Sequence, residues 1–273
     1  FMRHIRNLTI LLLLLFSWNQ FAGDLVYVAM QSTDEVIILN EESMDLSSIN
    51  IDYASTSNIP HFIVIDEVNR YWFVSAVGSG YLGCYNLDSN ALIDSIFIGD
   101  SPANMALNET DKKLYISQML PMGGMMQMES SRVFEIDYSN FPMVIVNEYQ
   151  LSSNGIHGIG INTDGDEVYA LSNTADWLYK INTQTSSIID TPMNLGMGID
   201  PNIDIKRLKP IECVHVNDSL LFVTCSAGMW YAGLTQDTIP GQVQLWNTNT
   251  MSLIDTLQFT WKSKPWHIVK SPN

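Results

Sequence analysis

Short runs of β-branched and aromatic residues alternate along the chain with clusters of Asn, Asp, Ser and Gly. Outside the first residues the runs have no helical periodicity, and their composition is typical of strands that end in tight turns. We therefore predict an all-β fold made of antiparallel hairpins. The clearest runs are LVYVAM, YWFVSA, LYISQ, VYALS and LFVTC, at 25–30, 71–76, 114–118, 168–172 and 221–225.

These runs belong to a longer repeat. Each is followed by a second run that ends in a polar turn and then by a third, and from the second copy onward a further strand precedes it. Four short strands in a repeat of about 40–55 residues is the period of β-propeller blades. We therefore predict a β-propeller of four-stranded antiparallel blades over 24–273, with about five blades present. The predicted blades are 25–54 without its first strand, 60–99, 102–152, 156–196 and 211–260, followed by the first strand of another blade at 265–273.

The repeat resembles that of the YVTN-repeat propellers, a family similar to surface-layer and lactonase-like proteins. Its pattern of Pro-His-x-Ile-x-Val, Tyr-Val-x-Asn, Val-x-Val-Ile-Asp and Val-x-x-Ile is matched most plainly by VYALSNTADWLYKINTQTSSIID. The tetrad that names the family appears here as YVAM, WFVS, YISQ, YALS and FVTC. The resemblance implies a ring of seven blades, so we expect this sequence to be incomplete at its C-terminal end. It implies an architecture rather than an activity, because propellers host many unrelated functions.

The N-terminal residues 1–23 have the pattern of a secretory signal peptide. A positive stretch that includes Arg3 is followed by the apolar run 8–18 and by small residues around Ala22. The run is shorter than the roughly 20 residues that a membrane-spanning helix needs. We expect the mature protein to be periplasmic, at the cell surface or secreted, with no membrane span. An uncleaved anchor is the alternative.

Charge and cysteine content narrow the partner classes. The chain has 29 acidic and 13 basic residues, a formal net charge of −16, so it lacks the basic surface that nucleic-acid binding requires. The expected partners are a protein, a small molecule or a glycan. Three cysteines are too few for a disulfide scaffold. Cys213 and Cys225 could approach each other on neighbouring strands, but we favour buried small hydrophobic residues for all three.

Two histidines occupy the same place in the repeat. His61 and His157 open the first strands of their blades, at a position that holds Ala103, Glu212 and Trp266 in the other copies. Neutral imidazoles suit copper, zinc or iron, so one hypothesis is a metal site of His61, His157 and Glu212 at the mouth of the central channel. The alternative is that these histidines are hydrogen-bonding groups that support turns. The chain lacks a haem-attachment motif.

Three insertions interrupt the repeat, and insertions in repeat proteins map to loops that often form the binding face. The segment 193–209 carries much of the local positive charge, and 227–240 contains Trp230 and Tyr231, which suit a sugar ring, a protein partner or the core. The segment 119–128 is rich in thioethers, which favour Cu(I) or form an adaptable contact surface for a partner or the channel mouth; a packed loop is the third possibility. Its methionines are Met119, Met122, Met125, Met126 and Met128.

Recognisable catalytic motifs are missing: the sequence has no nucleophile elbow, no P-loop and no dinucleotide fingerprint. The leading hypothesis is therefore an exported, non-catalytic propeller that binds its ligand through the loop face and the central channel. The rival hypothesis is an enzyme with its site at the channel mouth, either metal-dependent or similar to lactonases or oxidoreductases.

Overall fold

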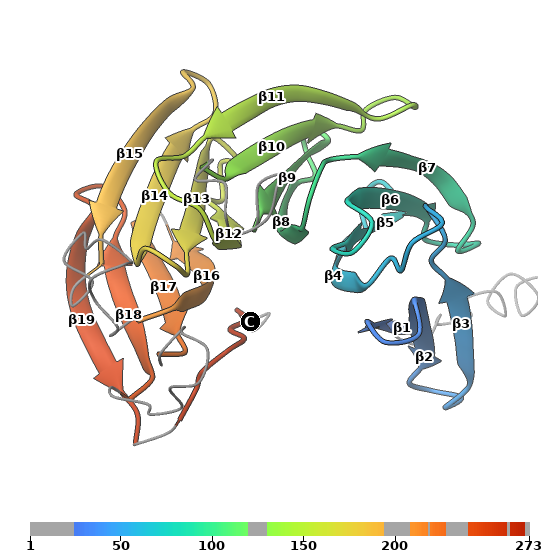
Figure 1. Cartoon of the computed structure of the whole chain (residues 1–273), viewed down its shortest axis with the longest axis horizontal. Coiled ribbons are helices and arrows are strands. Elements are labelled where there is room, and N and C mark those ends of the chain that lie inside the picture. Colours follow the sequence, from blue (N-terminus) through green and yellow to red (C-terminus); the bar gives the residue numbers. More distant parts are fainter. Residues whose placement is uncertain are drawn as a thin grey trace, which may run out of the picture.

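A computed structural model describes residues 25–119, 130–193, 208–217, 219–227, 240–260 and 263–270. Within these ranges every regular element is a strand, and the strands form five antiparallel sheets, which confirms the predicted all-β class. The sheets follow one another around an arc, each with its first strand toward the centre (Figure 1). No helix that could cross a membrane occurs among the described residues.

The strands follow chain order within every sheet. The first sheet has three strands, β1 (Leu25–Met30), β2 (Glu35–Asn40) and β3 (Leu46–Asn50). The second has β4 (Pro60–Asp66), β5 (Tyr71–Ala76), β6 (Tyr81–Asn86) and β7 (Leu92–Phe97), and the third has β8 (Pro102–Asn108), β9 (Lys113–Gln118), β10 (Arg132–Asp137) and β11 (Val144–Gln150). The fourth has β12 (Ile156–Ile161), β13 (Glu167–Ser172), β14 (Trp177–Asn182) and β15 (Ser187–Pro192), and the fifth has β16 (Pro210–Asn217), β17 (Leu220–Cys225), β18 (Gln242–Asn247) and β19 (Ser252–Gln258).

A separate hydrophobic core lies between each pair of neighbouring sheets. The central strands are buried on both faces, which is why β5 reads YWFVSA without a polar alternation. Trp72 on β5 stacks on Tyr85 of β6 with ring centroids 4.1 Å apart and meets Tyr27 of the first sheet at 5.3 Å. Burial of these faces against one another is what makes the sheets stand around a common axis.

Polar residues in the turns explain why the strands end where they do. In the turn after β6, Asn86 Oδ1 accepts the backbone N–H groups of Asp88 and Ser89 at 3.1 and 2.8 Å. Asn182 makes the same pair of bonds after β14. A side-chain oxygen that bonds to the backbone two and three residues later favours a turn over a continued strand. The repeated Asn or Asp therefore ends the penultimate strand of each sheet.

Hydroxyl groups join the first strands of successive sheets. Ser75 Oγ accepts the N–H of Phe62 at 3.1 Å and donates to the carbonyl of Ala103 in the next sheet at 2.7 Å. Ser117 makes equivalent bonds, accepting from Asn104 and donating to the carbonyl of His157, at 3.1 and 2.7 Å. These bonds fix where each first strand begins relative to its neighbour.

The strand predicted over 265–273 is not formed in the described residues 263–270. This segment lies along the fifth sheet, where Thr224 Oγ1 donates to the carbonyl of Trp266 at 2.9 Å and Glu212 accepts the N–H of Ile268 at 3.0 Å. Both contacts use side chains of the fifth sheet. A strand is defined by a backbone ladder with a neighbour, and these bonds do not make one.

Candidate functional site

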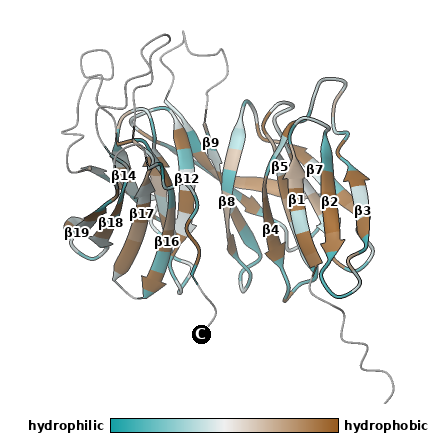
Figure 2. Cartoon of the chain, turned by 90° about the horizontal axis from the view of Figure 1, so that it is seen from below, coloured by the Kyte–Doolittle hydropathy of each residue, from teal (hydrophilic) through white to brown (hydrophobic). Residues whose placement is uncertain are grey.

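Connections between strands alternate between two faces of the arc, because neighbouring strands are antiparallel. The connections β9–β10, β15–β16 and β17–β18 are those that contain the predicted insertions. The start of a first strand and the end of a second strand lie on the same face of the arc. All three connections therefore begin or end on this face. His61 and His157, near the starts of β4 and β12, lie on it too. We call this the insertion face; it forms one edge of the side view in Figure 2. The described residues that flank the insertions are Met119 and Ser130, Met193 and Leu208, and Ala227 and Pro240.

His61 and His157 meet at the inner edge of the insertion face, the channel mouth. Their ring centroids are 5.5 Å apart, with the rings at 88° to one another, although β8 lies between β4 and β12. Register explains this contact, since Pro60, Pro102 and Ile156 pair with Ala76, Gln118 and Ser172 at equivalent places. The residue after Pro102 is Ala103, which has a methyl group where His61 and His157 have imidazoles.

His157 completes a bond that a hydroxyl makes in other sheets. The position of Ser117 is held by Leu171 in the fourth sheet, which has no hydroxyl. Instead, the Nδ1 atom of His157 lies 3.0 Å from the carbonyl oxygen of Ile211 in the next sheet. A carbonyl only accepts, so Nδ1 carries the proton and Nε2 keeps its lone pair in the neutral ring. Burial lowers the pKa of His157, which keeps the ring neutral.

His61 is also held neutral. Its Nδ1 atom lies 2.7 Å from the side-chain amide nitrogen of Gln31, the residue that follows β1. Burial is the main cause that lowers its pKa to about 4, and the nearby rings of His157 and His267 add to this. Two neutral imidazoles, each with one ring nitrogen bonded to the protein, therefore face each other at the channel mouth.

Register shows that Glu212 does not hold the repeat position of the two histidines, and its role as a metal ligand stays a prediction. Glu212 pairs with Thr224, as Phe62 pairs with Ser75, so Ile211 and not Glu212 is equivalent to His61. Its carboxylate accepts from Nδ1 of His267, 3.0 Å away, and from the N–H of Ile268. The strand β16 begins at Pro210, one residue earlier than the repeat suggested. Glu212 thus holds the segment 263–270.

The described residues contain no group of three His, Cys, Asp or Glu side chains placed to hold a metal ion. Met119 is described, and its backbone is bonded to the residues that precede β8 and β12: its N–H donates to the carbonyl of Ser101 at 2.9 Å, and its carbonyl accepts the N–H of Gly155 at 3.1 Å. The three cysteines are free and buried, as expected. The other predicted site residues lie outside the described residues: Met122, Met125, Met126, Met128, Trp230 and Tyr231.

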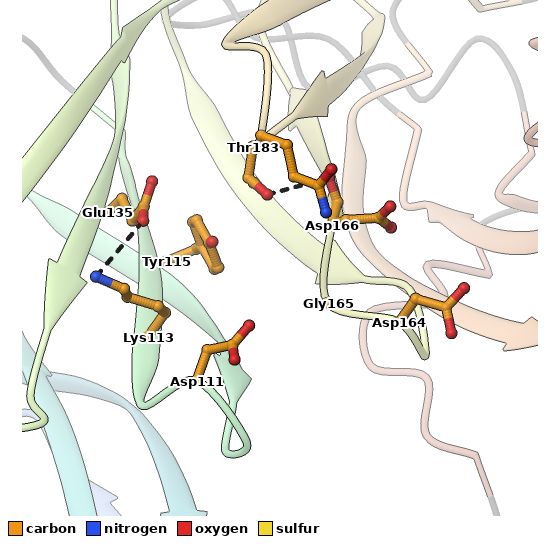
Figure 3. A pocket seen from close by; sticks show the side chains of 9 residues that line it. Asp111, Lys113, Tyr115, Glu135, Asp164, Gly165, Asp166 and Thr183 are labelled. Atoms are coloured by element: carbon orange, nitrogen blue, oxygen red, sulfur yellow. Dashed lines mark hydrogen bonds and ion pairs between the residues drawn. The ribbon is translucent and has the colours of Figure 1, made fainter.

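A cavity on the opposite face was missed by the sequence reasoning. It has a volume of about 430 Å³ and lies between the third and fourth sheets (Figure 3). Four carboxylates line it against one cation, Lys113, which lies 2.7 Å from Asp137 outside the lining. Because the lining comes from turns about 50 residues apart, the sequence pattern did not indicate this cavity. The carboxylates are those of Asp111, Glu135, Asp164 and Asp166.

Comparison with known proteins shows the fold. No family model matches the chain, and no curated protein does. Several solved structures are similar to it. A chain of a mitotic checkpoint complex is 15% identical, with a TM-score of 0.61, over 86% of this chain and 60% of that one. Kuenenia stuttgartiensis hydrazine synthase is 14% identical, with a TM-score of 0.64, over 83% of this chain and 60% of that one. A streptogramin B lyase is 11% identical, with TM-score 0.56, over 89% of this chain and 82% of that one. This chain thus spans 60% of the first two. The neighbours confirm a β-propeller fold.

Proposed function

We propose that the protein is an exported binding module that takes a protein partner on its insertion face. The observation that carries the proposal is that the residues flanking all three insertions share one face with the channel mouth. Insertions that accumulate on one side of a regular repeat mark the side on which contacts are made.

Two further observations support a binding role. The described residues place no nucleophile, base and orienting group together, and the two histidines are committed to structural hydrogen bonds. One structural neighbour belongs to a protein complex, although another is a lyase, so the fold alone does not separate the two classes. Catalysis at the channel mouth remains a prediction from the sequence.

Export and family are part of the same proposal. The pattern of residues 1–23 supports secretion to the periplasm, the cell surface or the medium. The degenerate YVTN tetrads support membership of the YVTN-repeat propellers. Small molecules and glycans are the alternative ligands, and Trp230 and Tyr231 are the residues that we would expect to stack on a sugar ring.

Site-specific photo-cross-linking in the producing cells tests the choice of face. A photoreactive residue is placed on the insertion face at Ser32 or Thr56, and in matched controls on the opposite face at Glu42 or Ser89; all four positions are exposed. We expect one defined protein adduct from the insertion-face positions and none from the controls. Equal adducts from both faces, or adducts from the controls alone, would overturn the proposal.

A further inference from the structure

We infer that the arc closes into a ring of five sheets, in which residues 265–270 supply the first strand that the first sheet lacks. The inference is independent of the proposed protein partner, because it rests on strand pairing and not on the insertions. It begins from two unmatched parts of the described chain: β1 has no neighbour on its inner edge, and 265–270 pairs with no strand. Both lie on the inner side of the arc (Figure 1).

The segment 265–270 already contacts the fifth sheet as the first strand of a following sheet does. Thr224 Oγ1 accepts the N–H of Glu212 at 3.2 Å and donates to the carbonyl of Trp266 at 2.9 Å. Ser75 makes the same two bonds in the second sheet, where it donates to the carbonyl of Ala103 in the next first strand. Trp266 therefore holds the place of Ala103. The sequence PWHIV of the segment also matches PHFIV at the start of β4.

The repeat fixes which residues of the segment and β1 would pair. β1 corresponds to β5, because a four-residue turn joins each of them to the next strand of its sheet. In the second sheet Ile63 pairs with Val74 of β5. The equivalent residues are Ile268 and Val28, so these two are expected to lie opposite each other. Val269, which is 85% exposed in the arc, would then take the place of a partly buried valine of β4.

The two ends of the arc have faces of the kind that is buried between neighbouring sheets. In the first sheet, Val26 and Val28 face away from the second sheet and are 36% and 42% exposed. In the fifth sheet, three apolar residues face away from the fourth and are only partly buried, although their equivalents in the second sheet are fully buried against the third. They are Phe222, Val243 and Leu245, at the places of Phe73, Leu82 and Cys84.

Closure satisfies both ends at once. The first sheet is the one described sheet with three strands, so it can accept the segment without losing a strand of its own. Pairing removes two open strand edges, and the two apolar faces cover each other. Five sheets lie within the range of four to eight blades found in propellers, and they differ from the seven that the family resemblance implies. The arc has to tighten, by a rotation that its four interfaces between neighbouring sheets share.

Oxidation of a double-cysteine variant of the full chain at low concentration tests the closure. In Val28→Cys with Ile268→Cys the two residues would be directly opposite, at the Cα separation that a disulfide needs. We expect an intramolecular disulfide, detected by peptide mass analysis without reduction. The matched control is Val28→Cys with Val269→Cys, whose side chains would lie on opposite faces of the sheet, and we expect no disulfide in it. The native cysteines are buried and should not compete.

Equal oxidation of the two variants, or no disulfide in either, would overturn the inference. A disulfide that links two copies would also overturn it, because the segment would then pair with another molecule. Since the substitutions could perturb folding, a second measurement uses the wild-type chain with labelled methyl groups. We expect a nuclear Overhauser effect between Val28 and Ile268 that persists when labelled copies are diluted with unlabelled ones. Resolved methyl signals with no such effect would contradict the closed ring.

Discussion

Single side chains decide how one sheet is joined to the next. Ser117 satisfies the N–H of Asn104 in its own sheet and the carbonyl of His157 in the following sheet, and it is fully buried. Where Leu171 replaces the hydroxyl, His157 supplies the donor from another position. His157 thus makes a structural hydrogen bond. From the sequence, a hydrogen-bonding role was the alternative to metal binding for this histidine.

Replacement of the joining hydroxyl is expected to destabilise the fold. In Ser117→Ala the buried N–H of Asn104 and the carbonyl of His157 both lose a partner, and each unsatisfied buried group costs about 1–3 kcal/mol. We expect the free energy of unfolding, measured by urea denaturation, to fall by about 2 kcal/mol or more. Ser252→Ala, at an exposed serine, is the control and should change it little. Equal values for the two variants would show that the bonds joining the sheets contribute nothing.

The lowered pKa of His61 predicts how stability depends on pH. In the folded chain this pKa is about 4, whereas in the unfolded chain it is near the ordinary value of about 6.5. Between these values the unfolded chain binds a proton that the folded chain does not. The free energy of unfolding therefore falls as pH drops through this window, by up to about 3 kcal/mol from His61, and the loss is complete below the folded pKa.

The comparison of wild type with His61→Phe isolates this effect from the titration of carboxyl groups. Urea unfolding at about pH 7 and about pH 5 should show a steeper loss of stability in the wild type. His157 remains in both chains, so its contribution cancels to first order. Parallel pH profiles would mean that His61 is not buried in the way described.

At the scale of elements, the turns and central strands followed from local composition. The run at 71–76 forms β5, and β6 and β14 each end at the Asn that begins the predicted polar turn. The register of β16 could not be predicted from local composition, because it depends on the pairing of Pro210 with Cys225 across the sheet. The segment 265–273 was predicted as a strand since its sequence repeats that of β4. Pairing is non-local, so composition alone could not settle it.

In two of the sheets, an aspartate carboxylate fixes the connection that leads into the next sheet. Asp34 accepts the N–H groups of Asn58 and Ile59 at 3.0 and 2.7 Å, bonds that lower its pKa, with that to Ile59 the largest cause. Asp176, fully buried, accepts those of Leu208 and Lys209 at 2.9 and 3.0 Å. Both aspartates have a positive φ in the turn before the third strand of the repeat. The connection that enters the next sheet is therefore fixed by the sheet before it.

Removal of the buried carboxylate should loosen the entry to β16. In Asp176→Ala two backbone N–H groups lose a charged acceptor, a change that costs at least about 2 kcal/mol. We expect lower stability in urea and faster hydrogen exchange at Leu208 and Lys209. The control is Asp52→Ala, at an exposed aspartate. Protection of the two amides that survives in Asp176→Ala would contradict the assignment.

At the scale of the whole molecule, each sheet buries its faces against its neighbours only. The second sheet has a core on both sides, whereas the fifth packs against the fourth on one side in the described part of the chain. In such repeat architectures stability is a sum of nearest-neighbour terms, so opening starts where a sheet has fewer neighbours. The sites follow the same logic, since the cavity and the channel mouth both combine residues of different sheets. For this reason the repeat indicated that His61 and His157 occupy equivalent positions but not that their rings are in contact.

Thiol labelling reports the order in which the sheets open. Burial raises the pKa of all three cysteine thiols, so the folded chain should react slowly. In mild urea we expect Cys225, in the core of the fourth and fifth sheets, to be labelled before Cys84, in the core of the second and third. Peptide mass analysis after a labelling pulse distinguishes the two. Equal labelling rates would indicate that the chain opens as one unit.

The most direct test of the arrangement is a nuclear Overhauser effect between two imidazoles. The chain has only five histidines, so ring signals can be assigned with single variants. His61 and His157 are 96 positions apart in the sequence and meet only if the first strands curve around a common axis, with ring centroids 5.5 Å apart. We predict a strong cross-peak between their ring protons in the histidine-labelled chain, and its loss in His61→Phe. Two well-resolved rings with no cross-peak would contradict the fold and the site together.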